Sequence, residues 1–245
     1  ANAIKQNEDL FKYADGVDQV FYYGAGASSY DLKAIVHRAL KRVFTKADII
    51  VDHDLLACAY ATYTGVPAIS CILGTGSNSC YFDGKELTEE VPALAYILGD
   101  EGSGSYFGKK LLSAFLYHHL PDEISKDLVA KFDLNKDVIM ENVYMMPHAN
   151  VYLASFMRFI ADHKENDWVK ETIYEGLKEF IRVHVYCFKE HKEVPVHFIG
   201  SVGYFFREQL ERSAKDLGVT LGTVTRKPID GLVDYHMNHM SLKLS

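Results

Sequence analysis

Two apolar segments joined by a turn of small residues constrain the fold of this chain more than any other feature. The segments are Ala68–Leu73 and Ser77–Phe82, and the turn between them is Gly74-Thr75-Gly76. Glycine has no Cβ, so the backbone N–H groups of such a turn can approach an anion closely. The pattern predicts two antiparallel strands whose connecting turn can bind phosphate; the alternative is a tight hairpin turn with no ligand.

A second loop places two carboxylates among glycines, directly before a helix. It reads Gly99-Asp100-Glu101-Gly102-Ser103, and the helical run Tyr106–Phe115 follows. Such carboxylates suit a polyhydroxy ligand or a hydrated metal ion. The alternative is a structural role, because acidic groups near a helix N-terminus are favourable in themselves. Together with the small-residue turn, the loop indicates phosphoryl transfer.

Strands and helices alternate in the first 67 residues. The segments are Gln19–Tyr23 as a strand, Tyr30–Phe44 as a helix capped by Ser28-Ser29, Ala47–Val51 as a strand and Asp54–Tyr63 as a helix. This alternation predicts parallel βαβ units.

The order of elements changes from Ala68 onward. A third strand is expected within Leu87–Leu98, and helices follow over residues 103–119, 122–131, 136–145, 149–163 and 168–191. The chain then alternates again, with strands at 194–199 and 219–224 and helices at 204–217 and 229–240. This second part has the order β-β-β-α-β-α-β-α, and the first part matches only its second half. We therefore expect a two-lobed α/β protein.

The expected boundaries follow from that order. Residues 1–67 form the remainder of an N-terminal lobe, and residues 68–245 form a C-terminal lobe with a helical insertion at about 120–192. The last helix is expected to be able to pack back on the first lobe.

Charge and composition exclude several classes of partner. The net charge is -7 and no long basic block is present, which argues against nucleic-acid and anionic-membrane binding. The N-terminal residues are polar, and no apolar run has the length of a membrane span. The four cysteines form no Cys-x-x-Cys pair, so we expect buried free thiols in a reducing, cytoplasmic compartment. The eleven histidines show no metal-binding spacing.

Four sequence blocks, taken in order, resemble the N-acetylglucosamine kinase branch of the BadF/BadG/BcrA/BcrD-type ATPases, within the superfamily of sugar kinases, heat-shock chaperone ATPases and actin. The blocks are Gly74–Cys80, Tyr96–Gly104, Phe198–Val202 and Pro228–Val233. The resemblance runs from about Tyr22 to His239. It implies two ribonuclease-H-like lobes with ATP, Mg²⁺ and a sugar in the cleft between them.

The resemblance also implies roles for individual residues. The ATP phosphates are expected at Gly74, Thr75 and Gly76, and the adenosine at Gly200, Ser201 and Val202. Taken alone, the second of these turns is merely a strand-to-helix connection. The sugar is expected at Asn78 and Asp100, with Glu101 and Ser103 completing the pocket or positioning a Mg²⁺-bound water. No set of protein metal ligands is expected.

The catalytic base implied by the resemblance is Asp54. It opens a helix directly after a strand, and α/β sheets bind ligands at the carboxyl ends of their strands. Such a carboxylate accepts the proton of the sugar hydroxyl during transfer. The alternative is a helix N-cap, where aspartate is also favoured. Asp52 is a rival base, but it falls within or just after the strand.

The chain departs from the family pattern in two places. No Asp-Gly-Gly-Thr type hairpin, the first phosphate loop of the family, precedes Tyr22. Either these residues lie upstream of Ala1, which we favour because a lobe without its central strands exposes an unpaired edge, or the chain is truncated and does not hydrolyse ATP. The second departure is Ala95, where the family usually has glycine before Tyr96; the added methyl group narrows the expected sugar pocket and puts the N-acetyl preference in doubt.

The expected function is therefore an ATP-dependent kinase acting on N-acetylglucosamine or a related amino sugar, at the 6-hydroxyl. One alternative is an ATPase that activates a partner enzyme, which requires cluster-binding cysteines at a subunit interface. The other is a non-catalytic sugar or nucleotide sensor. A homodimer is left open.

Overall fold

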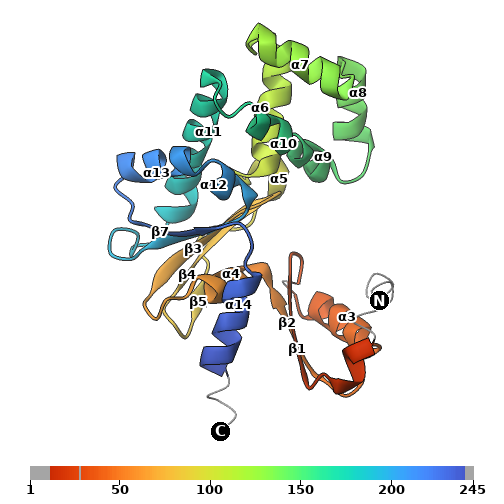
Figure 1. Ribbon diagram of the computed structural model, residues 1–245, viewed down its shortest axis with the longest axis vertical. Helices are drawn as coiled ribbons and strands as arrows, with labels where there is room; N and C mark the ends of the chain where they lie inside the picture. Colours follow the sequence, from red (N-terminus) through yellow and green to blue (C-terminus); the bar gives the residue numbers. More distant parts are fainter. Residues whose placement is uncertain (1–11, 28, 241–245) are drawn as a thin grey trace.

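The computed structural model describes residues 12–27 and 29–240, and its architecture is α/β (Figure 1). One sheet has two strands and the other has five. Most of the helices gather on the far side of the five-stranded sheet from the two-stranded one. No helix of the described part combines the length and hydrophobicity that crossing a membrane requires.

The two-stranded sheet is built from one βαβ unit. Strands β1 (Gln19–Gly24) and β2 (Asp48–His53) are parallel, and among the described residues each pairs only with the other. The connection is α3 (Tyr30–Lys41), whose N-cap Ser29 accepts a hydrogen bond from the Leu32 amide. A short 3₁₀ turn, η1 (Ala14–Gly16), precedes β1. A small buried cluster closes this unit; its members are Ala14, Leu40, Val43, Phe44, Ala47 and Ile49.

The five-stranded sheet has the order β5-β4-β3-β6-β7. The strands are β3 (Ala68–Leu73), β4 (Ser77–Phe82), β5 (Leu87–Thr88), β6 (Val196–Ile199) and β7 (Leu221–Thr225). β3 is antiparallel to β4 and parallel to β6. Helix α4 (Asp54–Thr62) connects the two sheets and covers one face of β3 and β4, where Leu55, Ala59, Cys80 and Phe82 form a buried cluster.

The opposite face of this sheet carries the main core. The chain between β5 and β6 forms α5 (Ala95–Leu98), α6 (Gly104–Leu116), α7 (Asp122–Phe132), α8 (Lys136–Met140), α9 (Ala149–Ser155), α10 (Met157–Asp162) and α11 (Asp167–Phe180). The chain between β6 and β7 forms α12 (Ser201–Phe205) and α13 (Arg207–Asp216). Phe107, Phe180 and Phe198 are fully buried in it. Burying one such side chain contributes about 1.5–3 kcal/mol, so this core dominates the stability of the larger unit.

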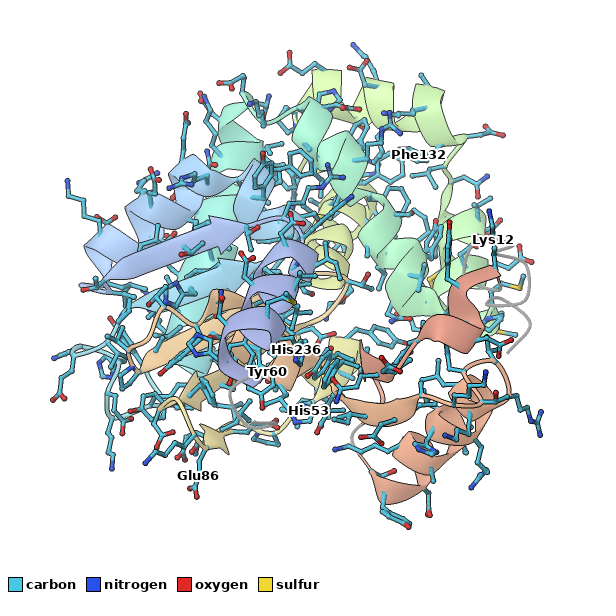
Figure 2. All side chains as sticks on the ribbon, turned by 60° about the horizontal axis from the view of Figure 1, so that its bottom comes forward. Lys12, His53, Tyr60, Glu86, Phe132 and His236 are labelled. Carbon is cyan, nitrogen blue, oxygen red and sulfur yellow. The ribbon has the colours of Figure 1, made fainter. Side chains whose placement is uncertain are left out.

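The last helix lies between the two sheets. It comprises α14 (Ile229–Tyr235) and the π-helical turn η4 (His236–Met240). Tyr235 stacks on Tyr60 of α4 at a ring-centroid distance of 4.0 Å, and His236 stacks on Phe21 of β1, also at 4.0 Å. The Tyr23 hydroxyl lies 3.1 Å from His236 Nε2. Figure 2 shows Tyr60 and His236 side by side at this junction. The C-terminal segment therefore packs on the first unit.

Several elements end where the sequence pattern did not predict. β2 extends two residues further, through Asp52 and His53, and β5 is only two residues long. The predicted 168–191 helix ends at Phe180 in a π-helical turn, η3 (Ile181–Val185), and a similar turn, η2 (Glu141–Met145), follows α8. The predicted 149–163 and 204–217 helices are each broken into two, at Phe156 and Phe206. The expected Ser28 cap lies outside the described residues.

Candidate active site

A cavity of about 820 Å³ lies where the two sheets meet. Its walls come from both sheets, from the loop before α5 and from α9; they are Ala25, Gly26, Lys33, His53, Asp54, Leu55, Ile72, Gly74, Thr75, Gly76, Ser77, Asn78, Glu89, Ala93, Ala95, Asp100 and Asn150. This volume is in the range of small-molecule sites. The structure thus brings together the predicted base, the small-residue turn and the two principal predicted sugar contacts.

The turn between β3 and β4 is held by the start of α6. The Gly104 amide donates to the Gly74 carbonyl at 2.8 Å, and the Ser105 amide donates to the Thr75 carbonyl at 3.0 Å. A Cβ at Gly76 would lie 2.8 Å from an Asp100 carboxylate oxygen, so only glycine fits there without a shift. The turn carbonyls therefore face α6, while the exposed Thr75 borders the cavity.

Asp54 and Asp52 occupy different environments. Asp54 is the first residue of α4 and lines the cavity. Asp52 does not line it; its carboxylate pairs with Lys33 Nζ at 2.7 Å and accepts from the His53 amide at 2.8 Å. Of the two carboxylates, Asp54 is therefore the one that can meet a ligand in the cavity.

Asp100 reaches the cavity from a strained turn. Its φ is +60°, a left-handed conformation that is uncommon for residues other than glycine. Its Oδ1 accepts a long hydrogen bond, 3.4 Å, from the Ser77 amide. Burial raises the pKa of Asp100 above its ordinary value, and the opposite charge of Lys109 offsets part of that rise.

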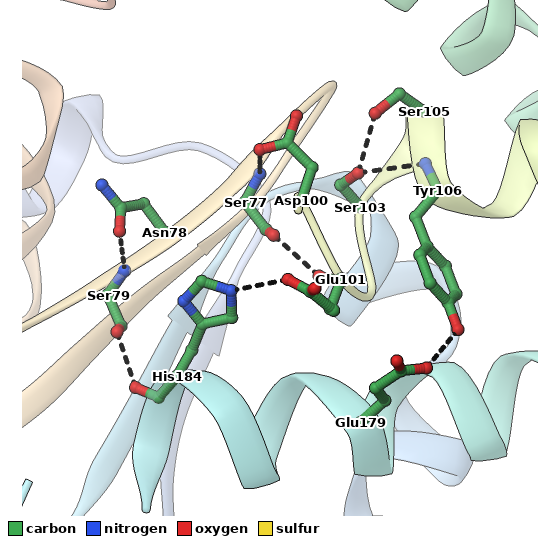
Figure 3. A network of polar contacts seen from close by, with 10 residues as sticks. All are labelled: Ser77, Asn78, Ser79, Asp100, Glu101, Ser103, Ser105, Tyr106, Glu179 and His184. Atoms are coloured by element: carbon green, nitrogen blue, oxygen red, sulfur yellow. Dashed lines mark hydrogen bonds and ion pairs between the residues drawn. The ribbon is translucent and has the colours of Figure 1, made fainter. Parts of the chain in front are cut away.

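Asn78 lies on β4 and lines the same cavity as Asp100, and its Oδ1 accepts from the Ser79 amide at 2.9 Å (Figure 3). That bond fixes the orientation of the Asn78 side chain. An amide and a carboxylate at neighbouring points of one wall can donate to and accept from adjacent hydroxyl groups.

Glu101 and Ser103 do not complete the pocket as the sequence suggested. Neither lines the cavity. The Glu101 carboxylate lies 3.0 Å from His184 Nε2, on the side of the turn facing η3. Ser103 is fully buried as the N-cap of α6, accepting from the Tyr106 amide at 3.2 Å. Figure 3 shows the Asp100 and Glu101 carboxylates extending from the turn in opposite directions.

The predicted adenosine turn lines a different cavity of about 450 Å³. Ser201 and Val202 border it together with Phe205 and Arg226, whose guanidinium lies 5.1 Å from the Phe205 ring centroid. Gly200 has φ +127°, and a Cβ there would lie 2.2 Å from the Leu73 carbonyl oxygen. Gly200 therefore packs against the backbone that leads into the Gly74 turn.

Several further cavity residues were not predicted from the sequence, among them Lys33, His53, Glu89, Ala93 and Asn150. His53 alone carried a signal, because it adjoins Asp54 after a strand. Asn150 comes from the helical insertion, and nothing in its local sequence indicates that α9 returns to the cavity. Ala95, which replaces the usual glycine of the family pattern, lies in the cavity wall with φ +55°.

Two observations bear on metal and thiol chemistry among the described side chains. No group of three or more His, Cys, Asp or Glu residues in 12–27 and 29–240 is arranged to hold a metal ion. The four cysteines are free, and Cys58, Cys71 and Cys80 are buried, which raises the pKa of each thiol.

The comparisons with known proteins give one informative relative. A structure from Porphyromonas gingivalis, described as a putative N-acetylglucosamine kinase, is 35% identical; the match covers 97% of this chain and 84% of that one, with a TM-score of 0.92. A second, from Chromobacterium violaceum and described in the same words, is 16% identical over 81% of this chain and 71% of that one, with a TM-score of 0.59, and shares the fold. No protein-family model and no curated protein matches the chain. At 35% identity over nearly its whole length, the chain belongs to the family of N-acetylglucosamine kinase-like proteins.

Proposed function

We propose that this protein is an ATP-dependent kinase that phosphorylates N-acetylglucosamine or a related amino sugar, at the hydroxyl on carbon 6. One observation carries the proposal. Asp54, the Gly74–Gly76 turn, Asn78 and Asp100 come from separate elements, and all line one cavity of about 820 Å³. The family relationship to a protein described as a putative N-acetylglucosamine kinase supports the same substrate class.

The Gly74-Thr75-Gly76 turn would hold the ATP phosphates. Its glycines leave room for backbone N–H groups to approach an anion, and the Thr75 hydroxyl adds a donor. Magnesium bound with ATP usually takes one or two carboxylates besides phosphate and water, so the few carboxylates of this cavity fit it without a protein cage. The metal would neutralise phosphate charge; Asp54, Glu89 and Asp100 are the carboxylates that line the cavity.

Asp54 would act as the base. It accepts the proton of the attacking hydroxyl as the phosphoryl group is transferred, a role that contributes about 10²–10⁴-fold. Its place at the start of α4 puts the side chain in the cavity wall. Asp52 is less suited, because Lys33 already occupies its carboxylate.

Asn78 and Asp100 would orient the sugar. Glu101 and Ser103 would hold the turn that carries Asp100 in place, Glu101 through its contact with His184 and Ser103 as the N-cap of α6. The Ala95 methyl group stands in the same cavity, so it is placed to limit the size of the substituent on the amino group.

The nucleoside would lie at Gly200, Ser201 and Val202. The cavity there offers an aromatic ring, Phe205, and a cation, Arg226, for stacking on a purine. In this interpretation the two sheets are the ribonuclease-H-like lobes of a BadF/BadG/BcrA/BcrD-type ATPase, with residues 1–67 belonging to the first and residues 68–245 to the second.

The proposal is tested with a panel of sugars. Purified protein is supplied with MgATP and each of N-acetylglucosamine, glucosamine, N-acetylmannosamine and glucose, and ADP release is measured. We expect the N-acetylated or free amino sugars to give the highest kcat/KM. ATP and sugar binding without ADP release, measured by calorimetry, would instead favour a sensor.

Asp54→Asn is the matching variant. We expect it to lower kcat at least about a hundredfold, because it removes proton acceptance but keeps the size of the side chain. ADP affinity, measured by calorimetry, stays near that of the wild type. Asp52→Asn is the control and should keep most of the activity. An Asp54→Asn enzyme with wild-type turnover would remove Asp54 from the mechanism.

The alternative function, an ATPase that activates a partner enzyme, has less support. Its cluster would need cysteines at an accessible interface, and three of the four described cysteines are buried in the core. An iron-containing preparation would revive it.

A further inference from the structure

We propose that His184 is a positioning residue for the sugar-binding wall, acting on Asp100 through Glu101. The inference rests on the proposed function in one respect, since that function assigns Asp100 to the sugar. His184 itself does not line the cavity. It lies 83 positions from Glu101, in the π-helical turn η3 that follows α11.

The first support is the bond between the two side chains. His184 Nε2 lies 3.0 Å from Glu101 Oε2, and the two side chains are only 5% and 18% exposed (Figure 3). A carboxylate accepts hydrogen bonds, so this contact places a proton on Nε2. A charge-assisted bond shielded from water is stronger and better oriented than a neutral, exposed one.

The second support is that two further hydrogen bonds join the same parts of the chain, and that a ring at the end of α11 packs on His184. The Ser77 hydroxyl donates to the Glu101 carbonyl at 2.7 Å, and the Ser79 hydroxyl donates to the His184 carbonyl at 2.6 Å. Phe180 stacks on the His184 ring at 4.8 Å. β4, the loop Gly99–Ser103 (here called the acidic turn) and η3 thus form one connected network, which Figure 3 shows from close by.

The third support is the cost of burying this imidazole. Among the described residues, His184 Nδ1 has no hydrogen-bond partner, although the ring is buried. A buried polar ring with an unpaired nitrogen is unfavourable compared with an apolar side chain that fills the same space. The one described use of the ring's polarity is the bond to Glu101, which accounts for a histidine at this position.

The backbone conformation of the acidic turn needs a contact that holds it in place. Asp100 and Gly102 both have positive φ, +60° and +68°, and a Cβ at Gly102 would lie 2.9 Å from Phe180 Cβ. A non-glycine residue keeps a left-handed backbone only where its surroundings hold it there. Without the His184 bond, the side-chain anchor of Glu101 is lost, and the Asp100 carboxylate can turn away from the cavity.

The experiment compares His184→Leu with His184→Gln. Leucine removes the donor, whereas the glutamine amide nitrogen can occupy the position of Nε2. With N-acetylglucosamine as the probe, we expect His184→Leu to lower kcat/KM for the sugar about tenfold to a hundredfold, the size of effect seen when a reacting group is misplaced by about 1 Å. His184→Gln should recover most of that loss, and the KM for ATP should change little in either variant.

A double-mutant cycle separates positioning from general destabilisation. Because His184 acts through Asp100, adding His184→Leu to Asp100→Asn should lower kcat/KM for the sugar by much less than it does in the wild type. Additive effects would overturn the proposal. The control is His197→Gln, at a buried histidine whose Nδ1 accepts from the Thr223 amide at 2.8 Å and which is remote from the acidic turn. It should leave the sugar KM unchanged.

A readout without catalysis keeps this test distinct from the proposed function. Amide hydrogen exchange of residues 99–104 should speed up in His184→Leu and return towards the wild-type rate in His184→Gln, in folded protein without substrate. Unchanged exchange with an unchanged sugar KM refutes the positioning role. Faster exchange in a protein that phosphorylates no sugar would support the His184 link and refute the kinase assignment alone.

Discussion

Asp100 carries two costs that an ordinary turn residue avoids. Its backbone is left-handed without being glycine, and its carboxylate is partly buried. A left-handed conformation costs about 1–2 kcal/mol for a residue with a Cβ. Such costs concentrate where a side chain must be held in one place for binding. The conformation of Asp100 therefore lowers the stability of the fold and holds a carboxylate in one place in the cavity.

Asp100→Asn should accordingly stabilise the fold at neutral pH. Burial raises the pKa of Asp100, so the folded protein binds this proton more tightly than the unfolded chain does. That contribution is complete below the unfolded pKa of about 3.9 and is lost as the pH rises through the folded pKa. We expect a higher Tm for Asp100→Asn at pH 7 and equal Tm values near pH 3, measured by thermal unfolding. A variant less stable than wild type at pH 7 would contradict this view.

The residues that were predicted from the sequence are those with a local signal. Asp54 follows a strand, and Gly74-Thr75-Gly76 separates two strand segments, so both stand out locally, although the resemblance to the kinase family was needed to assign their roles. His184 and Asn150 could not be identified in this way. Each sits in a helical segment that looks like ordinary packing, and its contact with the site spans many intervening residues.

Helices and strands were predicted best where a proline or glycine stands at each end of a buried hydrophobic segment. β3 begins after Pro67 and ends before Gly74, and its predicted bounds agree with the structure. The long helices were predicted less well, because the π-helical turns that end α8, α11 and α14 carry no sequence signature. Their positions are set by packing, as the burial of Ile181, His184 and Val185 in η3 illustrates.

Contact between α6 and α9 depends on a glycine. A Cβ at Gly108 would lie 2.0 Å from the Leu153 carbonyl oxygen, which belongs to the backbone and cannot swing aside. Gly108→Ala should therefore destabilise the protein by about 1–3 kcal/mol, despite the better helix propensity of alanine. Thermal unfolding measures this as a lower Tm. Gly203→Ala, a helical glycine whose added Cβ meets its nearest atoms at 3.4 Å, should cost little.

At the scale of the whole molecule, α14 and η4 hold the two sheets together. Tyr235 stacks on α4, while His236 contacts Phe21 and Tyr23 of β1. Asp54 is the first residue of α4, so the predicted base belongs to the helix against which the C-terminal helix packs. The geometry of the cavity therefore depends on a segment that contributes none of its lining.

Gly231→Ala tests that dependence. A Cβ at Gly231 would lie 2.2 Å from the Ala61 carbonyl oxygen, so alanine must push α14 away from α4. We expect amide hydrogen exchange to accelerate in β1 and β2 more than in β3 and β6, because the smaller unit has little core of its own. Gly108→Ala should show the reverse order. Equal acceleration in both sheets would mean that α14 is not the link.

The close contact at Gly200 has one more consequence. Its backbone lies so close to the Leu73 carbonyl, one residue before the turn proposed for the phosphates, that no Cβ fits, while the next two residues border the cavity proposed for the nucleoside. In that proposal the separation between the two ends of a bound nucleotide would be set by a backbone-to-backbone crossing, in which no side chain can adjust. Such a fixed spacing would select nucleotides by their length, and shortening the phosphate chain by one unit would leave one of its two ends without a partner.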